Sequence, residues 1–496
     1  MIRPLLLFLL LIVGVAPVNA AESVWEKSVV TVEVTFKDYD FFQPWNTPTR
    51  SVRKHGLYVG NREVVTTAQY LPTETLVRLQ KGGRGKWYAA KVVWFDPHAD
   101  LAVITSDDPE FWVGLRPARL AKAIPQAQDF NLIRWRDGNL ESRRVEFSKF
   151  AVKDGSLSFA PRLTLELNTD LGGLGWAEPV TLDGTVAGLT TSKSGNTCNV
   201  VPAPFIRQIL EARAKGRYPG MGYFDFVWEP GENPTTLEHL KLKGPGRGAI
   251  VIRVPNRPGV EPVLKPKDIL LEVDGFPIDV AGDYLDPQYG HLLLENLSSR
   301  GHLAGDTVRM KVWRDGAETN ISYVLPKAQY HDDLVPRELF DHPPEYVVAG
   351  GLVFQALDQP FLRGWGEDWR RRAPFRLQHY QNSAPTPERP SLVLLSTVLP
   401  DPVNVGYQDA RLLVVDRING HRISTLADVV EALKDPKDGV HRVEFMKGDT
   451  LQSLLLDAAS MDQATQRVIR RYGLPAAQRI TGPTAQQKAQ GTKSGA

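Results

Sequence analysis

Residues 28 to about 200 carry short stretches in which apolar and polar side chains alternate. In the first stretch Val30, Val32 and Val34 alternate with polar residues, which is the period of a half-buried β-strand. Residues 56–66 then have a hairpin pattern that turns at Gly60-Asn61. Further apolar runs follow at residues 89–95, 101–105, 163–167 and 186–190, and a helical pattern closes the series at 205–214. Many short strands closed by one helix predict a β-barrel or sandwich domain over residues 24–215.

The rest of the chain divides into two smaller units that share a weak repeat. Strand patterns in the first unit, residues 218–327, stand at 248–254, 269–273, 308–313 and 319–324, and a helical pattern at 289–299. A polar, proline-containing linker at 327–344 leads to the second unit, residues 345–480. Each unit has a strand, a tight turn (Asp274-Gly275 or Asn419-Gly420), a short strand and then a helix, which in the second unit begins at Ser424 or Thr425. This order resembles that of PDZ domains.

The two ends of the chain differ in composition from the rest. Arg3 precedes an apolar run at residues 5–15, and small residues follow at the positions that a signal peptidase reads. We therefore predict a signal peptide at residues 1–20, cleaved after Ala20, and an exported protein in a bacterial periplasm. The alternative is an uncleaved anchor, although the apolar run is shorter than the ~20 residues of a membrane span. Residues 481–496 are polar and nearly free of apolar side chains, which predicts a disordered tail.

Charge and motif content exclude several kinds of partner. The 59 basic and 57 acidic residues give a formal net charge of +2, so nothing favours nucleic acid or an anionic membrane as a partner. The sequence has no zinc-type Cys/His spacing, phosphate-binding loop or dinucleotide fingerprint, and no metal or cofactor is expected. The single cysteine, Cys198, cannot form an internal disulfide, and we expect it to be buried. The basic run at 370–372 is interpreted as a solvated surface.

Three segments of the first unit resemble the catalytic segments of one protease family. Residues 63–71 resemble a strand and loop that end in Thr-Asn-Ala-His-Val, and residues 96–104 resemble the segment that supplies a catalytic Asp. Residues 173–188 resemble Gly-Asn-Ser-Gly-Gly-Pro with its downstream Asp-Gly turn. Together with the PDZ-like units, they resemble the Deg/HtrA family, most closely its plant-type Deg branch. The resemblance runs from about residue 28 to 480. It implies a mainly β fold, with a trypsin-like double β-barrel followed by two α+β PDZ-type domains.

The resemblance places Gln69 at the catalytic His, Asp100 at the Asp and Gly175 at the nucleophilic Ser. Acyl transfer needs a nucleophile and a base that accepts its proton near neutral pH. Glycine has no side chain and a glutamine amide does not titrate, so this degenerate triad predicts no catalysis. We expect Asp100 to hydrogen-bond Gln69, and the bulky Trp176 to fill the substrate cleft. His98 lies two residues before Asp100 and is not expected to replace the missing base.

PDZ domains bind an extended peptide by adding it to a sheet edge, and a glycine-containing loop receives its carboxylate. The resemblance implies two peptide-binding segments: Gly222, Tyr223, Phe224, Asp225 and Phe226 in the first unit, and Gly350, Gly351, Leu352, Val353 and Phe354 in the second. Asp225 stands where the family usually has Gly and would repel a carboxylate. Internal peptide segments, or an empty groove, are therefore expected there. The alternative is that Phe224 and Phe226 only fill the core.

Three classes of function stay open on this basis. We favour a catalytically inactive Deg/HtrA-like pseudoprotease that acts as a scaffold, chaperone or regulator in envelope protein quality control. Its partners would be unfolded or extended peptide segments and partner proteases. The alternatives are an active serine endopeptidase and a purely structural oligomer-forming protein. The resemblance also implies a trimer-based homo-oligomer, and no membrane contact is expected after signal cleavage.

Overall fold

The structure, a computed structural model, describes residues 24–481 except 127, 174, 256–260, 329–332, 339, 341 and 367. The predicted signal peptide at 1–20 and the predicted tail from residue 482 onward lie outside the described residues. The described part of the chain is built mainly from β-strands, as the alternating pattern predicts.

The N-terminal half of the first domain is a closed antiparallel barrel. Its strands are β1 (Val29–Lys37), β2 (Thr49–Gly60), β3 (Glu63–Thr66), β4 (Glu74–Lys81), β5 (Tyr88–Asp96) and β6 (Leu101–Thr105). They are ordered β1-β2-β3-β6-β5-β4 around the barrel, and the short helix α2 (Pro109–Trp112) follows β6. Val30, Val32 and Val34 are fully buried inside it. The hairpin between β2 and β3 turns at Asn61 and Arg62, which both have positive φ.

A second closed antiparallel barrel follows. Its strands are β7 (Phe130–Arg136), β8 (Asn139–Lys153), β9 (Arg162–Asn168), β10 (Pro179–Leu182), β11 (Thr185–Ser194) and β12 (Thr197–Pro202), in the order β10-β11-β12-β9-β8-β7. Helix α3 (Ala203–Ala214) begins directly after Pro202 and contacts β11 and β12. It buries Phe205, Ile206 and Ile209, and Cys198 on β12 is also buried. Two closed six-stranded barrels in tandem form the predicted trypsin-like double barrel.

The second unit is one antiparallel sheet with a separate hairpin. Its sheet strands are β13 (Val227–Pro230), β14 (Ala249–Arg253), β15 (Ile269–Val273), β16 (Phe276–Pro277), β19 (Thr307–Arg314) and β20 (Ala317–Val324). Their order is β13-β14-β15-β19-β20, with β16 paired to β15. The hairpin consists of β17 (Asp283–Asp286) and β18 (Gly290–Leu293). A short helix, α4 (Pro234–His239), and a 3-10 helix, η1 (Leu294–Ser298), complete the unit.

The structure does not contain the helix predicted over residues 289–299. The first part of that segment is β18, and only the η1 part is helical. The Asp286 carboxylate accepts hydrogen bonds from the backbone N–H groups of Gln288 (2.8 Å) and Tyr289 (3.1 Å). This side-chain cap stabilises a turn, and the turn pairs the following residues with β17. The leucines whose spacing predicts a helix therefore lie in strand β18 and in the 3-10 helix η1.

The third unit contains the longest sheet. Its strands are β21 (Tyr346–Ala349), β22 (Leu352–Ala356), β23 (Val393–Val398), β24 (Leu413–Ile418), β25 (His421–Arg422), β26 (Val440–Phe445), β27 (Ser453–Asp457) and β28 (Gln478–Arg479). Their order is β27-β26-β24-β23-β22-β21-β28, with β25 paired to β24. The helices are α5 (Gln359–Arg363), α6 (Trp369–Arg372), α7 (Phe375–Gln378), α8 (Leu426–Ala432) and α9 (Met461–Tyr472), with 3-10 turns η2 (His379–Asn382) and η3 (Pro402–Asn404). Thr425 caps α8, as the sequence predicts.

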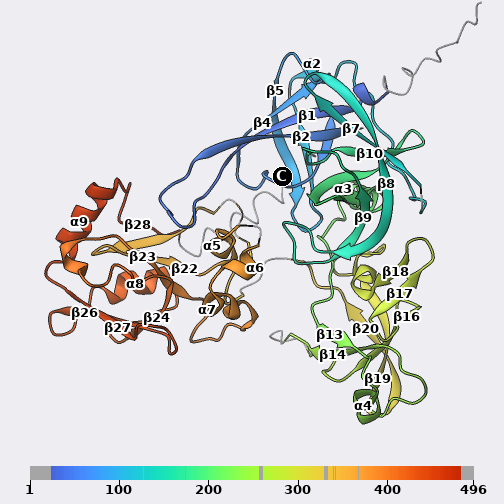
Figure 1. The fold of residues 1–496 in the computed structure, drawn as a ribbon. Helices are drawn as coiled ribbons and strands as arrows, with labels where there is room; N and C mark the ends of the chain where they lie inside the picture. Colours follow the sequence, from blue (N-terminus) through green and yellow to red (C-terminus); the bar gives the residue numbers. More distant parts are fainter. Residues whose placement is uncertain are drawn as a thin grey trace, which may run out of the picture.

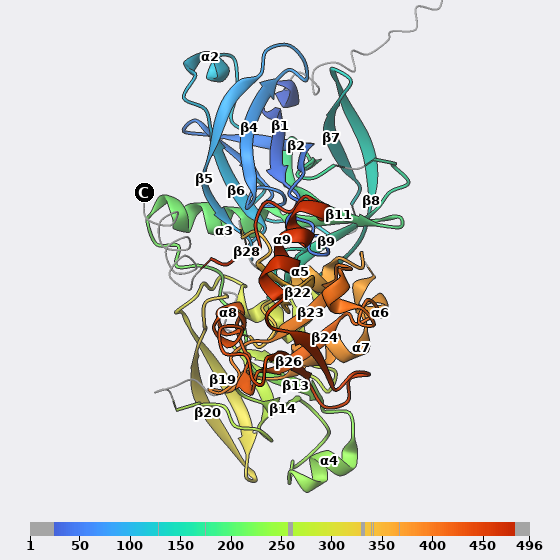
Figure 2. The same ribbon diagram turned by 90° about the vertical axis from the view of Figure 1, so that its left-hand side faces the viewer.

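Figure 1 shows the two barrels above the two later units, which lie at the lower right and the left. In the view turned by 90° the third unit stands in front of the second (Figure 2). The loop between β1 and β2 joins the first barrel to the third unit: the Phe42 ring meets Phe361 and Trp365 edge-on, at centroid distances of 5.4 and 4.8 Å. Gln355 Nε2 also donates to the carbonyl of Phe41 across 2.9 Å. No helix in the described part of the chain is long and apolar enough to cross a membrane.

Candidate functional site

The loops that carry the three triad positions meet between the two barrels. Gln69 follows β3 and Asp100 precedes β6, whereas Gly175 lies between β9 and β10 of the second barrel. Tyr70, the neighbour of Gln69, stacks on Trp176 with ring centroids 6.0 Å apart. The N–H of His55 on β2 donates to the Trp176 carbonyl across 3.0 Å. The fold thus brings the segments together as the resemblance implies.

Gln69 and Asp100 form the hydrogen bond expected from the sequence. Gln69 Nε2 donates to Asp100 Oδ2 at 2.7 Å, and the other carboxylate oxygen accepts from the Ala68 N–H at 3.0 Å. Asp100 is fully buried with a positive φ of 54°, and Gln69 is 6% exposed. Gln69 Nε2 also lies 3.1 Å from Ser156 Oγ, on the loop between β8 and β9. Gln69 therefore links Asp100 to Ser156, a serine that does not stand at the nucleophile position, which is Gly175.

Two basic side chains are buried beside Gln69 and Asp100. Lys54 on β2 is fully buried, and its ammonium group donates to the carbonyls of Thr67 (2.5 Å) and Gln69 (3.1 Å). Burial lowers the pKa of Lys54 to about 7, although the charge of Asp100 acts in the opposite direction. Arg162 Nη2 lies 3.4 Å from Asp100 Oδ2. Burial raises the pKa of Asp100, and Arg162, Gln69 and Lys54 each oppose that rise. Asp100 is thus the counter-ion of a buried charge cluster.

The turn at Gly175 has its own internal acceptor. The N–H of Gly175 donates to Glu178 Oε1 at 2.9 Å, and the Gly175 carbonyl accepts from Thr190 Oγ1 at 2.9 Å. In a serine protease the N–H of the nucleophile residue is one of the two donors that stabilise the oxyanion. Here the side chain of Glu178 already occupies that donor. Burial raises the pKa of Glu178 to about 7, against the effect of the Gly175 hydrogen bond.

The predicted peptide-binding segment of the second unit is hydrogen-bonded to the C-terminal end of β20 and the residues after it. The N–H of Tyr223 donates to the Pro326 carbonyl at 3.3 Å, and Tyr323 OH bonds the Asp225 carboxylate. Phe224 and Phe226 are 8% and 5% exposed and pack on the Tyr323 ring. The alternative interpretation, in which both aromatic rings fill the core, agrees with this packing. The carboxylate of Asp225 is held by a hydroxyl group rather than facing an open groove.

The predicted segment of the third unit cannot accept a strand. Residues 352–356 form β22, which pairs with β21 on one side and with β23 on the other. Leu352, Val353 and Phe354 are buried, and the N–H of Gly350 donates to Thr465 Oγ1 of α9 at 2.8 Å. The chain's own β21 takes the edge that a peptide would use. This corrects the expectation of peptide binding at 350–354.

A profile of the PDZ domain matches residues 335–479. The putative protease Do-like 13 of Arabidopsis thaliana is 24% identical over 466 residues, covering 92% of this chain and 89% of that protein. The putative mitochondrial protease Do-like 3 of the same plant is 23% identical over 458 residues, covering 91% and 79%. These matches support a member of the Deg/HtrA family with plant-type Do-like relatives. The solved structure of the HtrA-type protease AlgW with a decapeptide is 15% identical with a TM-score of 0.47, covering 62% of this chain and 97% of that chain.

In the described part of the chain a serine–histidine pair lies near the degenerate triad. His98 Nδ1 lies 3.1 Å from Ser158 Oγ. His98 is 5% exposed, and its ring packs edge-on against Phe159. Ser158 Oγ also accepts from the Ala160 N–H at 3.0 Å, which makes it part of a local turn. In the described residues no group of three or more His, Cys, Asp or Glu side chains is placed to hold a metal ion.

Motif matching misses several residues of this candidate site. Ser156 and Ser158 come from a loop that no family motif marks, and only the folded chain brings them to Gln69 and His98. Lys54 does leave a signal, because a lysine followed by His-Gly-Leu-Tyr interrupts an otherwise strand-like run. Glu178 stands where the motif has proline, and its role depends on a turn geometry that the substitution alone does not reveal.

Proposed function

We propose that this protein is a non-catalytic member of the Deg/HtrA family that binds polypeptide segments without hydrolysing them. The observation that carries the proposal is the 2.7 Å hydrogen bond between Gln69 Nε2 and Asp100 Oδ2. An amide nitrogen in that place donates to the carboxylate, but the amide cannot accept a proton from a nucleophile at neutral pH. Gly175 supplies no nucleophile at all.

The occupied oxyanion donor supports the same proposal. A peptide carbonyl that entered the site would have to displace Glu178 from the Gly175 N–H. Removing one oxyanion donor costs roughly 100- to 1,000-fold in rate even when a triad is intact. The site therefore lacks the nucleophile, the base and one free oxyanion donor.

Polypeptide binding is assigned to the edge of the second unit. Strand β13 ends its sheet, and within the described residues it pairs only with β14. An extended segment can add to such an edge through main-chain hydrogen bonds. The Trp228 indole on β13 donates to Glu295 Oε1 of η1 at 2.8 Å and lies beside this edge. Its ring is half-buried and packs against Gly282 and the core of the unit.

The cellular setting is part of the proposal. The signal-peptide pattern at residues 1–20 supports export to a bacterial periplasm, where unfolded segments and partner proteases are the expected ligands. A trimer-based homo-oligomer follows from the family resemblance.

The test is to incubate the purified mature chain with an unfolded model protein and to follow both cleavage and light scattering. The proposal predicts no cleavage and a reduced aggregation of the unfolded protein. Cleavage that co-purifies with the chain contradicts the inactive site, and unchanged aggregation, together with no binding of extended peptides, favours the purely structural alternative. A Gln69→His/Gly175→Ser variant tests whether the rest of the site still supports hydrolysis.

A serine endopeptidase is the second candidate, and the 3.1 Å contact between His98 Nδ1 and Ser158 Oγ favours it. A nucleophile and base within hydrogen-bond distance are the first geometric requirement of such an enzyme. If the natural chain cleaves the model protein, Ser158→Ala decides between the candidates: loss of cleavage assigns the activity to this pair.

A further inference from the structure

Two short helices of the third unit, α6 and α7, are attached to it by one face. Their buried side chains, Trp369, Ala373 and Leu377, pack with Leu362 and Leu392 in the core of this unit. Figure 2 shows both helices at the outer edge of the unit. The residues between the buried positions are exposed, and we call Arg370, Arg371, Arg372 and Phe375 together the α6–α7 surface.

The arginines of the α6–α7 surface give it an excess of positive charge. Among the described residues no carboxylate forms an ion pair with Arg371 or Arg372. Arg370 acts on Asp154 of the first domain: burial raises the pKa of Asp154, and the charge of Arg370 opposes that rise. Residues 368–379 contain four arginines and one carboxylate, so their formal net charge is +3 with histidine neutral. The near-balance of the whole chain averages over this local excess.

An aromatic ring stands exposed beside these charges. Phe375, the first residue of α7, is 82% exposed, more than any other large apolar side chain in the described residues. Its ring faces the exposed His379 ring at a centroid distance of 6.1 Å. A single exposed apolar side chain is common on protein surfaces. Here it directly follows a helix of three exposed arginines, and this combination of an aromatic ring with cations is typical of membrane-interface segments.

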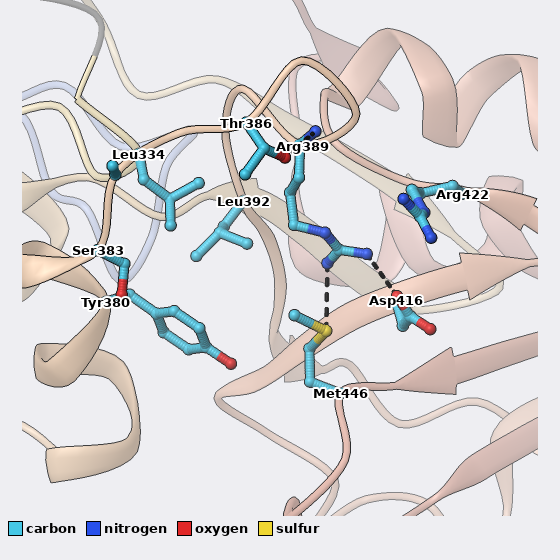
Figure 3. A pocket seen from close by; sticks show the side chains of 10 residues that line it. Leu334, Tyr380, Ser383, Thr386, Arg389, Leu392, Asp416, Arg422 and Met446 are labelled. Carbon is cyan, nitrogen blue, oxygen red and sulfur yellow. Dashed lines mark hydrogen bonds and ion pairs between the residues drawn. The ribbon is translucent and has the colours of Figure 1, made fainter. Parts of the chain in front are cut away.

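The α6–α7 surface is not the wall of a cavity. Arg371, Arg372 and Phe375 line neither of the two cavities found in the described part of the third unit. Figure 3 shows one of these cavities, where Arg389 is already hydrogen-bonded to Asp416. A polypeptide segment binds in a groove or at a sheet edge, and the two helices offer neither. The surface therefore suits a broad anionic partner that needs no groove.

We propose that the α6–α7 surface docks the protein on an anionic lipid membrane. The guanidinium groups of Arg371 and Arg372 contact lipid phosphates, and the Phe375 ring enters the boundary between headgroups and acyl chains, where aromatic side chains are enriched. One ring and a few charges give a reversible attachment, far weaker than a membrane-spanning helix. The inference does not depend on the proposed function, because it requires neither an inactive triad nor strand addition at β13.

The experiment is flotation of the mature chain, residues 21–496, with lipid vesicles, so that the apolar run at the N-terminus cannot contribute. The vesicles contain either phosphatidylcholine alone or phosphatidylcholine with about one-third phosphatidylglycerol. We expect at least about tenfold tighter binding to the anionic vesicles. This preference should disappear when NaCl is raised from about 0.1 to about 0.5 M, because salt screens the charges.

Three outcomes overturn the proposal: no binding to either kind of vesicle, equal binding to both kinds, or binding to the anionic vesicles that salt does not weaken. Poly-glutamate is the third probe. If it binds while the vesicles do not, the α6–α7 surface takes an acidic polypeptide rather than a membrane.

The matched variants for charge are Arg371→Gln/Arg372→Gln on α6 and Arg470→Gln/Arg471→Gln on α9. Both pairs are adjacent exposed arginines of the third unit. The α6 variant should bind the anionic vesicles more than about tenfold more weakly, since each arginine near the surface contributes about fivefold. The α9 variant should bind as the natural chain does. Unchanged affinity in the α6 variant, or equal losses in both variants, contradicts the proposal.

The matched variants for the ring are Phe375→Ser and Val113→Ser. Val113 is 70% exposed and lies directly after α2 of the first domain. Phe375→Ser should weaken binding to the anionic vesicles about fivefold, because its ring no longer leaves water, and Val113→Ser should change nothing. Unchanged unfolding temperatures confirm that all four variants are folded. Equal affinity of Phe375→Ser and the natural chain contradicts the proposed insertion of the ring.

Discussion

Gln69 Nε2 and Asp100 Oδ2 lie 2.7 Å apart, at the two positions that the family resemblance assigns to the catalytic His and Asp. The geometry of the link is kept, because a glutamine amide can donate to Asp100 just as an imidazole N–H does. The chemistry is not kept, because the amide has no basic nitrogen for the next step. The second barrel matches this change: Gly175 has no nucleophile, and its N–H is bonded to Glu178.

Glu178→Gln should stabilise the protein at high pH. Burial raises the pKa of Glu178 from 4.5 to about 7, so the folded chain keeps a proton that the unfolded chain has lost between these values. The stabilisation from this group is fully present below pH 4.5 and is lost as the pH rises through 7. Glutamine keeps the Oε1 acceptor and cannot ionise. Urea unfolding at pH 4.5 and 8 should show the variant gaining up to roughly 3 kcal/mol relative to the natural chain at the higher pH.

Glu141→Gln is the control for this measurement, because its sign is opposite. The hydrogen bond from Arg134 lowers the pKa of Glu141, and that stabilisation is present above its ordinary pKa of 4.5. The variant should therefore be less stable than the natural chain at pH 8. The same pH trend in both variants would mean that burial of Glu178 is not the cause.

Lys54→Met should change the pH dependence in the alkaline range. Burial lowers the pKa of Lys54 from 10.5 to about 7, so between these values the unfolded chain binds a proton that the folded chain has released. Stability of the natural chain then rises with pH in that window, by up to roughly 4 kcal/mol from this group. Methionine cannot titrate and leaves the Thr67 carbonyl without its donor. In urea unfolding, the free energy of unfolding of the natural chain should rise relative to that of Lys54→Met between pH 7 and 10. A difference that stays constant with pH would contradict this prediction.

The fold could be predicted well from local patterns, and the site only in part. The period of Val30, Val32 and Val34 is enough to predict a barrel strand, because one face of the strand must be buried. The hydrogen bond between Gln69 and Asp100 follows from motif positions alone. The pairing of β22 with β23 is different: β23 begins at Val393, far along the chain from the end of β22 at Ala356, and no local pattern decides this pairing. The contact of Ser158 with His98 joins residues 60 positions apart and is hidden for the same reason.

Phe42→Ala should loosen the third unit from the first barrel. The Phe42 ring packs edge-on against Phe361 and Trp365. It also lies so close to Gly364 that a Cβ atom there would be only 2.8 Å from the ring, so the contact is tight. Truncation removes this aromatic contact, one of the main side-chain links between the two units. Small-angle scattering should show a larger radius of gyration. Phe375→Ala is the control, because Phe375 is 82% exposed; equal changes in the two variants would contradict the role of Phe42.

A fluorophosphonate probe tests most directly the proposal that the chain holds no activated serine. Such a probe forms a covalent adduct with a serine only when a neighbouring base activates the hydroxyl group. Intact-mass measurement of the mature chain after incubation with the probe should show the unmodified mass, while a catalytic serine protease in the same tube is fully labelled. A single adduct on the natural chain, at Ser158 or at any other serine, would contradict the inactive site.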